Sequence, residues 1–144
     1  MITDDLKQAK SEVHYGLDTI IIPMGENLVY HTEMMLRNVF TDVIISEYSN
    51  IDISKSETSY IMIPKLLFAE NATGPWLWSP AKAAIAMEWK MIKRSGEKVW
   101  IETITGTYVD KMGGTKEAIK QAYTDLLRKS QEQMLSSKIL RNLQ

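Results

Sequence analysis

The two histidines are the side chains best suited to acid–base or metal chemistry, but neither has the neighbours that such chemistry requires. A zinc site needs several converging His or carboxylate ligands, often with two His residues four positions apart on a helix. His14 and His31 do not have this spacing. Glu33 lies two positions after His31, which places it on a different side of a helix. We therefore expect His31 to be a partly exposed helix residue, and the sequence predicts no metal site.

Serines and glycines also lack the patterns that catalysis or phosphate binding requires. Ser54 and Ser56 flank Lys55 in a polar stretch, and this is not the Ser-x-x-Lys spacing of a nucleophile with its base. The glycines near residues 106 and 113–114 form neither a P-loop nor a G-x-G-x-x-G pattern. The chain has no cysteine, which excludes a cysteine nucleophile and a thiolate metal site. The sequence thus predicts no catalytic residue and no cofactor, and we expect a protein that is not an enzyme.

One loop has the composition of a contact surface. It contains two tryptophans separated by one residue and stiffened by nearby prolines. Such rings either fold over the core or mark a binding surface, where Trp is enriched. Both interpretations stay open, and the candidate contact loop consists of Pro75, Trp76, Leu77 and Trp78.

The overall composition is that of a single globular domain. Of the 144 residues, 44% are hydrophobic and 24% are charged. The 17 basic and 18 acidic residues give a net charge of −1, which argues against nucleic acid as a partner. No apolar run approaches the roughly 18–20 residues of a membrane span. Residues 1–10 are polar and show no signal peptide.

The first half of the chain predicts alternating short elements. We expect residues 1–16 to be a flexible lead-in and residues 17–144 to form one domain. Residues 17–23 are apolar and β-branched, which predicts a buried strand. Residues 25–42 carry apolar side chains at three- and four-residue steps, which predicts an amphipathic helix. A short strand at residues 43–46 would complete a right-handed parallel crossover.

The second half predicts a long hairpin followed by a helix. Residues 60–68 predict a strand in which Pro64 belongs at an edge or a bulge, and residues 69–80 predict a loop. The alternation over residues 81–93 predicts a half-buried strand. A turn at Ser95–Gly96 and a partner strand at residues 98–109 would follow, with Trp100, Ile104 and Tyr108 on the side of Trp89 if the loop has two residues.

A helical stripe begins after Thr115, a predicted N-cap, and continues toward Leu143 with a break near Ser136–Ser137. The predicted fold class is α+β, in the order β-α-β-β-β-β-α. A mixed or antiparallel sheet of about four to five strands, including the long hairpin, would carry two amphipathic helices on one face.

Four segments together resemble a known family. A helix opens with Gly25-Glu26-Asn27-Leu28, a strand contains Tyr60-Ile61-Met62-Ile63-Pro64, the hairpin runs from Trp89 to Trp100, and the last helix contains Glu117-Ala118-Ile119-Lys120-Gln121-Ala122. Over about residues 17–135 this arrangement is similar to the small periplasmic domains of Gram-negative outer-membrane lipoproteins, such as the lipopolysaccharide-assembly lipoprotein. The family implies a lipid-anchored cysteine at the mature N-terminus. Since this chain has no cysteine, the resemblance implies that the anchor was removed.

Two functions follow as hypotheses. The resemblance implies a periplasmic, outer-membrane-associated domain that acts through contact with another envelope protein in envelope assembly or transport. The alternative is a module that binds a small apolar ligand or lipid, which a pocket lined by Met87, Trp89 and Met91 would favour. If Met1 is the native start, a cytoplasmic binding role is expected instead.

Overall fold

The central strand of the main sheet is β4 (Ala81–Lys93), with the bounds predicted from the alternating pattern. It lies between β3 (Tyr60–Thr73) and β5 (Lys98–Asp110) in a three-stranded antiparallel sheet. The computed structural model describes residues 4–15, 18–41, 43–44, 60–73, 79–112 and 114–141. One face of β4 is buried, and its row of core side chains is the predicted one: Ala83, Ile85, Met87, Trp89 and Met91.

The β4–β5 hairpin turns at Gly96, whose φ of 87° lies in the left-handed region that favours glycine. The Lys93 N–H donates to the Glu97 carbonyl, so the loop has three residues and not the two on which the expected strand face depended. A register shift at Val99 absorbs the extra residue, and Met91 then pairs with Trp100. Trp100, Ile104 and Tyr108 therefore lie on the side of Trp89, the same face that a two-residue loop would give.

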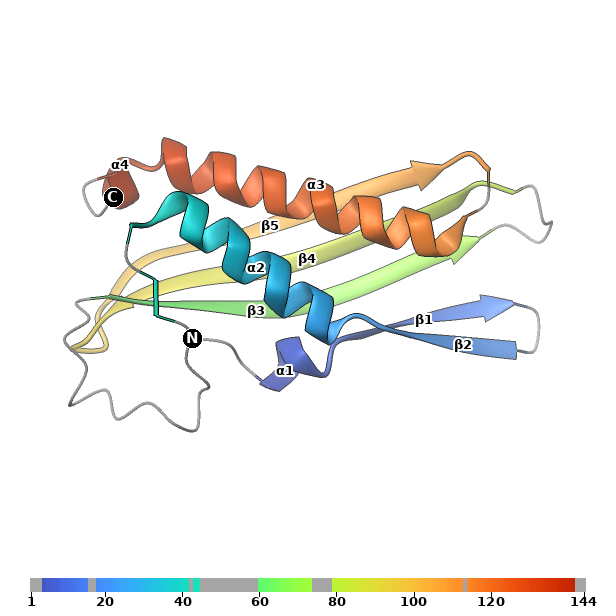
Figure 1. Ribbon diagram of the computed structural model, residues 1–144, viewed down its shortest axis with the longest axis horizontal. Coiled ribbons are helices and arrows are strands. Elements are labelled where there is room, and N and C mark those ends of the chain that lie inside the picture. Colours follow the sequence, from blue (N-terminus) through green and yellow to red (C-terminus); the bar gives the residue numbers. More distant parts are fainter. Residues whose placement is uncertain are drawn as a thin grey trace.

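Two long helices, α2 (Gly25–Val39) and α3 (Thr115–Ser136), lie over the same face of this sheet (Figure 1). Both bury the stripe that their periodicity predicts, with Leu28 and Met35 among the core residues of α2 and Ala118 and Leu126 among those of α3. The predicted break is also confirmed, because a short helix α4 (Lys138–Arg141) begins after Ser137. Thr115 is not the N-cap: Gly114 occupies that position, and Thr115 is the first, buried residue of α3.

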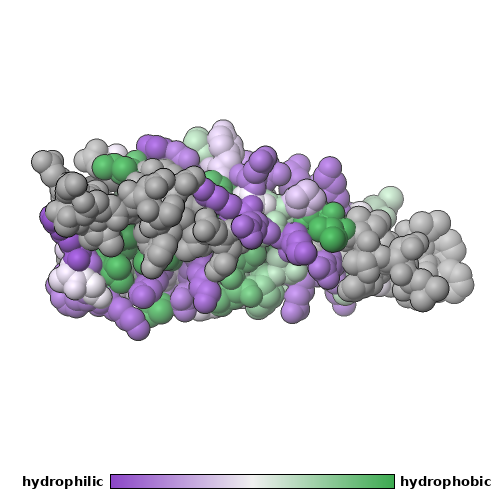
Figure 2. Space-filling view, turned by 90° about the horizontal axis from the view of Figure 1, so that it is seen from below, coloured by the Kyte–Doolittle hydropathy of each residue, from purple (hydrophilic) through white to green (hydrophobic). Residues whose placement is uncertain are grey.

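The predicted flexible lead-in is wrong for the described residues before position 16. They form helix α1 (Asp4–Lys7) and strand β1 (Lys10–Tyr15), and Leu6 is fully buried in the core. Gly25 explains how α1 packs so closely, because a Cβ at this position would overlap the carbonyl group of Lys7. Figure 2 shows the molecule from below the view of Figure 1, and on this side polar and apolar side chains are interspersed over the described surface.

The predicted parallel crossover is not found among the described residues, and residues 45–46 of its predicted second strand lie outside them. Strand β2 (Asp18–Pro23) pairs antiparallel with β1 in a separate two-stranded sheet, and the described residues Val43 and Ile44 are in no strand. The described strands are thus divided between two sheets and do not form the single sheet of four to five strands that we expected. Strand β2 is not fully buried either, because Ile21 is 55% exposed. A two-stranded ribbon needs only one covered face, which the local apolar run could not reveal.

The edge position predicted for Pro64 is confirmed, since β3 is bonded within its sheet to β4 alone. Residues 69–73, predicted as part of a loop, continue β3 beyond a bulge between Leu66 and Phe68. The side chain of Asn71 donates a 2.8 Å hydrogen bond to the carbonyl oxygen of Glu12. This bond links the first hairpin to the main sheet.

Candidate functional site

A groove between α2 and α3 in the described structure could hold a ligand. The helices are joined where Tyr123 donates a 2.8 Å hydrogen bond to the carbonyl oxygen of Leu28. The Thr32 hydroxyl lies 3.2 Å from the same phenol oxygen. Burial raises the pKa of Tyr123, so the phenol stays protonated and can act as the donor.

In Figure 1 the N-terminal ends of the two helices lie farther apart than their C-terminal ends. The groove between the helices has a volume of about 860 Å³, within the range of small-molecule sites, and it is lined by Leu28 and Tyr123 and by residues on either side of their contact. Its remaining wall comes from the end of β2 and the residues that lead into α2. The apolar lining consists of Ile22, Pro23, Met24, Leu28, Ile119, Tyr123 and Leu127.

The rim of the groove is polar and carries a small excess of positive charge. Lys116 and Lys120 project from the first turns of α3 and are exposed. The Lys120 ammonium lies 4.0 Å from a carboxylate oxygen of Glu117, a loose and exposed ion pair. Lys116 has no ion-pair partner among the described residues. An acidic group at this rim would therefore meet a cation that is not already neutralised.

His31 also lies at this rim and is exposed, as predicted for a helix residue. Its ring centroid is 6.1 Å from that of Tyr123, in a tilted arrangement. His14 lies in β1, and its side chain is outside the described part of the structure. Within the described residues, no group of three or more His, Cys, Asp or Glu side chains could hold a metal ion.

Neither of the two pockets described in the structure is lined by Met87, Trp89 and Met91, the lining that would favour the apolar-ligand alternative. All three side chains are at most 3% exposed, pack in the core, and line neither this groove nor a smaller slot beside β5. The groove was missed because its helix residues, such as Leu28, Ile119 and Leu127, belong to stripes that predict burial, and nothing in the sequence distinguishes a stripe residue that lines a groove from one that is fully packed.

The candidate contact loop of Pro75, Trp76, Leu77 and Trp78 lies outside the described residues, as do Ser54, Lys55 and Ser56. No described helix is both long enough and apolar enough to span a membrane. The chain matches no protein-family model, and no curated protein or solved structure is significantly similar to it. The lipoprotein resemblance and the functions that it implies therefore stay predictions.

Proposed function

We propose that this protein is a non-enzymatic binding module that holds an amphiphile, an apolar chain with an acidic head group, in the groove between α2 and α3. The observation that carries the proposal is the apolar groove of about 860 Å³ with an unneutralised lysine at its rim. Sites of this kind combine a mostly apolar wall with a few polar groups that orient the ligand.

The apolar wall supports a hydrocarbon chain as the body of the ligand. Each methylene group removed from water stabilises the complex by about 0.8 kcal/mol. Leu28 and Ile119 supply wall that is already buried, whereas the half-buried Leu127 gains cover when a chain enters. The buried hydrogen bond from Tyr123 to Leu28 joins the two helices that line the groove and already uses the phenol proton.

The rim supports an acidic head group. Lys116 and Lys120 outnumber Glu117 among the charged residues that line the groove. An anion placed between the two ammonium groups would form charge-assisted hydrogen bonds that a neutral head group cannot form. In the cell-envelope setting that the lipoprotein resemblance implies, such an amphiphile is a lipid, and the partner that delivers or receives it is another envelope protein.

Titration with cis-parinaric acid, a fatty acid that fluoresces in apolar surroundings, tests the groove. We expect saturable binding that Leu127→Glu weakens by about tenfold or more, since it places a carboxylate on the apolar wall. Leu135→Glu is the matched control, because Leu135 is 41% exposed on the same helix and does not line the groove. Equal binding by both variants, or no saturable binding by the native protein, would refute the groove as the site.

Competition against the same probe tests the head group. Dodecanoate should displace cis-parinaric acid at lower concentration than dodecanol or dodecylamine. This preference should disappear in the Lys116→Gln, Lys120→Gln double variant, while the affinity for dodecanol stays the same. If the double variant retains the preference for dodecanoate, the rim lysines do not select the head group.

A further inference from the structure

The free edge of β5 is covered by α3 over only part of its length. The ammonium group of Lys129 donates a 3.2 Å hydrogen bond to the carbonyl oxygen of Thr105. The Thr107 N–H donates a 3.1 Å hydrogen bond to a carboxylate oxygen of Asp125. Gly106 permits this close contact, because a Cβ there would overlap the backbone of Ala122 and Leu126. One outward backbone group of Thr105 and one of Thr107 are thus hydrogen-bonded to side chains of α3.

Closer to the hairpin turn, no side chain of α3 is hydrogen-bonded to the described edge of β5. Backbone groups of alternate residues in an antiparallel strand point the same way. The N–H and C=O groups of Ile101 and Thr103 therefore point away from β4, as those of Thr105 and Thr107 do. In the described structure no hydrogen bond reaches these outward groups of Ile101 and Thr103. An uncovered edge of this kind is a template for another strand.

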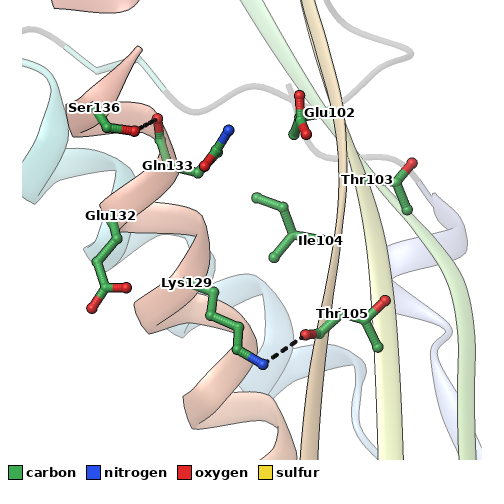
Figure 3. A pocket seen from close by; sticks show the side chains of 8 residues that line it. All are labelled: Glu102, Thr103, Ile104, Thr105, Lys129, Glu132, Gln133 and Ser136. Atoms are coloured by element: carbon green, nitrogen blue, oxygen red, sulfur yellow. Dashed lines mark hydrogen bonds between the residues drawn. The ribbon is translucent and has the colours of Figure 1, made fainter.

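A slot of about 460 Å³ separates this part of β5 from the C-terminal half of α3. Figure 3 shows Ile104 pointing toward α3, with Glu102 and Gln133 beside it and Thr103 on the other side of the strand. The carboxylate of Glu102 has no ion-pair partner among the described residues. In contrast, Lys129 and Glu132 are already paired with Asp125 and Arg128.

We propose that the β5 edge at residues 101–103 binds an extended segment of another protein by strand addition. The unpaired backbone groups of Ile101 and Thr103 would supply the main-chain hydrogen bonds. Ile101 is 47% exposed on the outer face of the sheet, which favours an apolar residue opposite it. Glu102 lies on the opposite, helix-facing side and favours a Lys or Arg in the segment. The partner segment thus alternates apolar and basic residues.

A second copy of this chain fits the same edge poorly. If two β5 strands paired antiparallel about a two-fold axis at Glu102, their carboxylates would lie directly opposite each other. Like charges in this position destabilise a strand pair. Three α3 residues also line the slot: Glu132, Gln133 and Ser136. The sheet and helix of a second copy would therefore have to fit beside α3, where there is room for one strand.

The probe for this site is an acetylated and amidated Thr-Val-Arg-Val-Thr peptide. At millimolar concentration it should slow the amide hydrogen exchange of Ile101 and Thr103, measured by NMR, by about tenfold or more. Methylation of both valine amides removes the peptide donors and should abolish the protection. The Thr-Val-Glu-Val-Thr peptide should bind more weakly, because it places a carboxylate opposite Glu102.

Two protein variants and one control complete the test. Thr103→Pro removes one outward N–H without removing a bond to β4, a substitution that edge strands tolerate, and it should abolish binding. Glu102→Lys should reverse the preference in favour of the glutamate peptide, and it tests the site even if Thr103→Pro unfolds the protein. Leu127→Glu should bind the peptide normally, which separates this edge from the groove. Unchanged exchange at Ile101 and Thr103, or equal protection by the methylated peptide, would overturn strand addition.

Discussion

The phenol of Tyr123 in α3 and the carbonyl oxygen of Leu28 in α2 form a buried 2.8 Å hydrogen bond across 95 residues of sequence. This bond joins the two helices in the wall of the groove that they line. The Thr32 hydroxyl lies 3.2 Å from the same phenol, so one aromatic side chain is tied to two residues of the facing helix. A polar contact therefore holds together the two helices between which the groove lies.

Replacing Tyr123 with phenylalanine should lower the free energy of unfolding by about 1–2 kcal/mol. The substitution leaves the buried Thr32 hydroxyl without its interhelical partner, and an unpaired buried polar group is costly. Urea denaturation followed by circular dichroism measures the loss. Tyr30→Phe makes the same chemical change at a residue that is 59% exposed and should stay within about 0.5 kcal/mol of the native protein. Equal losses in the two variants would contradict the importance of this bond.

Two glycines should respond differently to alanine. Gly106→Ala should cost about 3 kcal/mol, because its methyl group would overlap the backbone of α3 and push the helix away from β5. Gly96→Ala meets open space and should cost only about 1 kcal/mol, the strain of a positive φ. Gly96→Asn should be nearly neutral, because asparagine tolerates this conformation. Thermal and urea unfolding of the three variants check this order, and a Gly106→Ala protein of native stability would rule out the close helix–strand contact.

Trp89 is fully buried, as predicted, and its indole N–H has no hydrogen-bond partner among the described residues. Trp89→Ala should cost about 3–5 kcal/mol, the usual loss for a large aromatic truncation. Trp89→Phe should cost much less, about 1 kcal/mol, because it removes an unsatisfied N–H together with part of the ring. Urea denaturation measures both losses from the shift of the transition midpoint, provided that the slope of the free energy of unfolding against urea concentration stays the same. A phenylalanine variant as unstable as the alanine variant would indicate that the indole N–H has a partner after all.

Asp125 should make stability depend on pH in the acid range. Burial acts to raise its pKa, but hydrogen bonds from Lys129, Arg128 and the Thr107 N–H together lower the pKa to about 2. The unfolded-state pKa is about 3.9, so the stabilisation is present above that value and is lost as the pH falls toward about 2. After allowance for solvent screening, its size is about 1 kcal/mol.

Asp125→Asn should therefore be less stable than the native protein above about pH 5, and the difference should shrink as the pH falls through about 4 to 2. Urea titrations at a series of pH values measure this convergence. Glu132→Gln is the matched control, since it also loses a pair with Arg128 but at an exposed site, and its effect should stay small. Parallel pH profiles for the native protein and Asp125→Asn would show that the carboxylate does not contribute in this way.

The elements with strong local periodicity could be predicted from the sequence. The period-two pattern of residues 81–93 determined the bounds of β4 and the burial of Trp89. The three- and four-residue spacing determined the buried stripes of α2 and α3, and Pro64 indicated an edge strand. Each of these features depends on side chains within one element, so it is encoded in neighbouring residues.

The candidate sites were decided by the tertiary structure alone. The groove lies between α2 and α3, which Tyr123 joins near Leu28, so its shape is set by residues far apart in the chain. The open edge at Ile101 and Thr103 exists because α3 covers β5 only around Thr105 and Thr107. Local patterns show which side of an element is apolar, but which other element covers that side, and how far, depends on packing between distant segments.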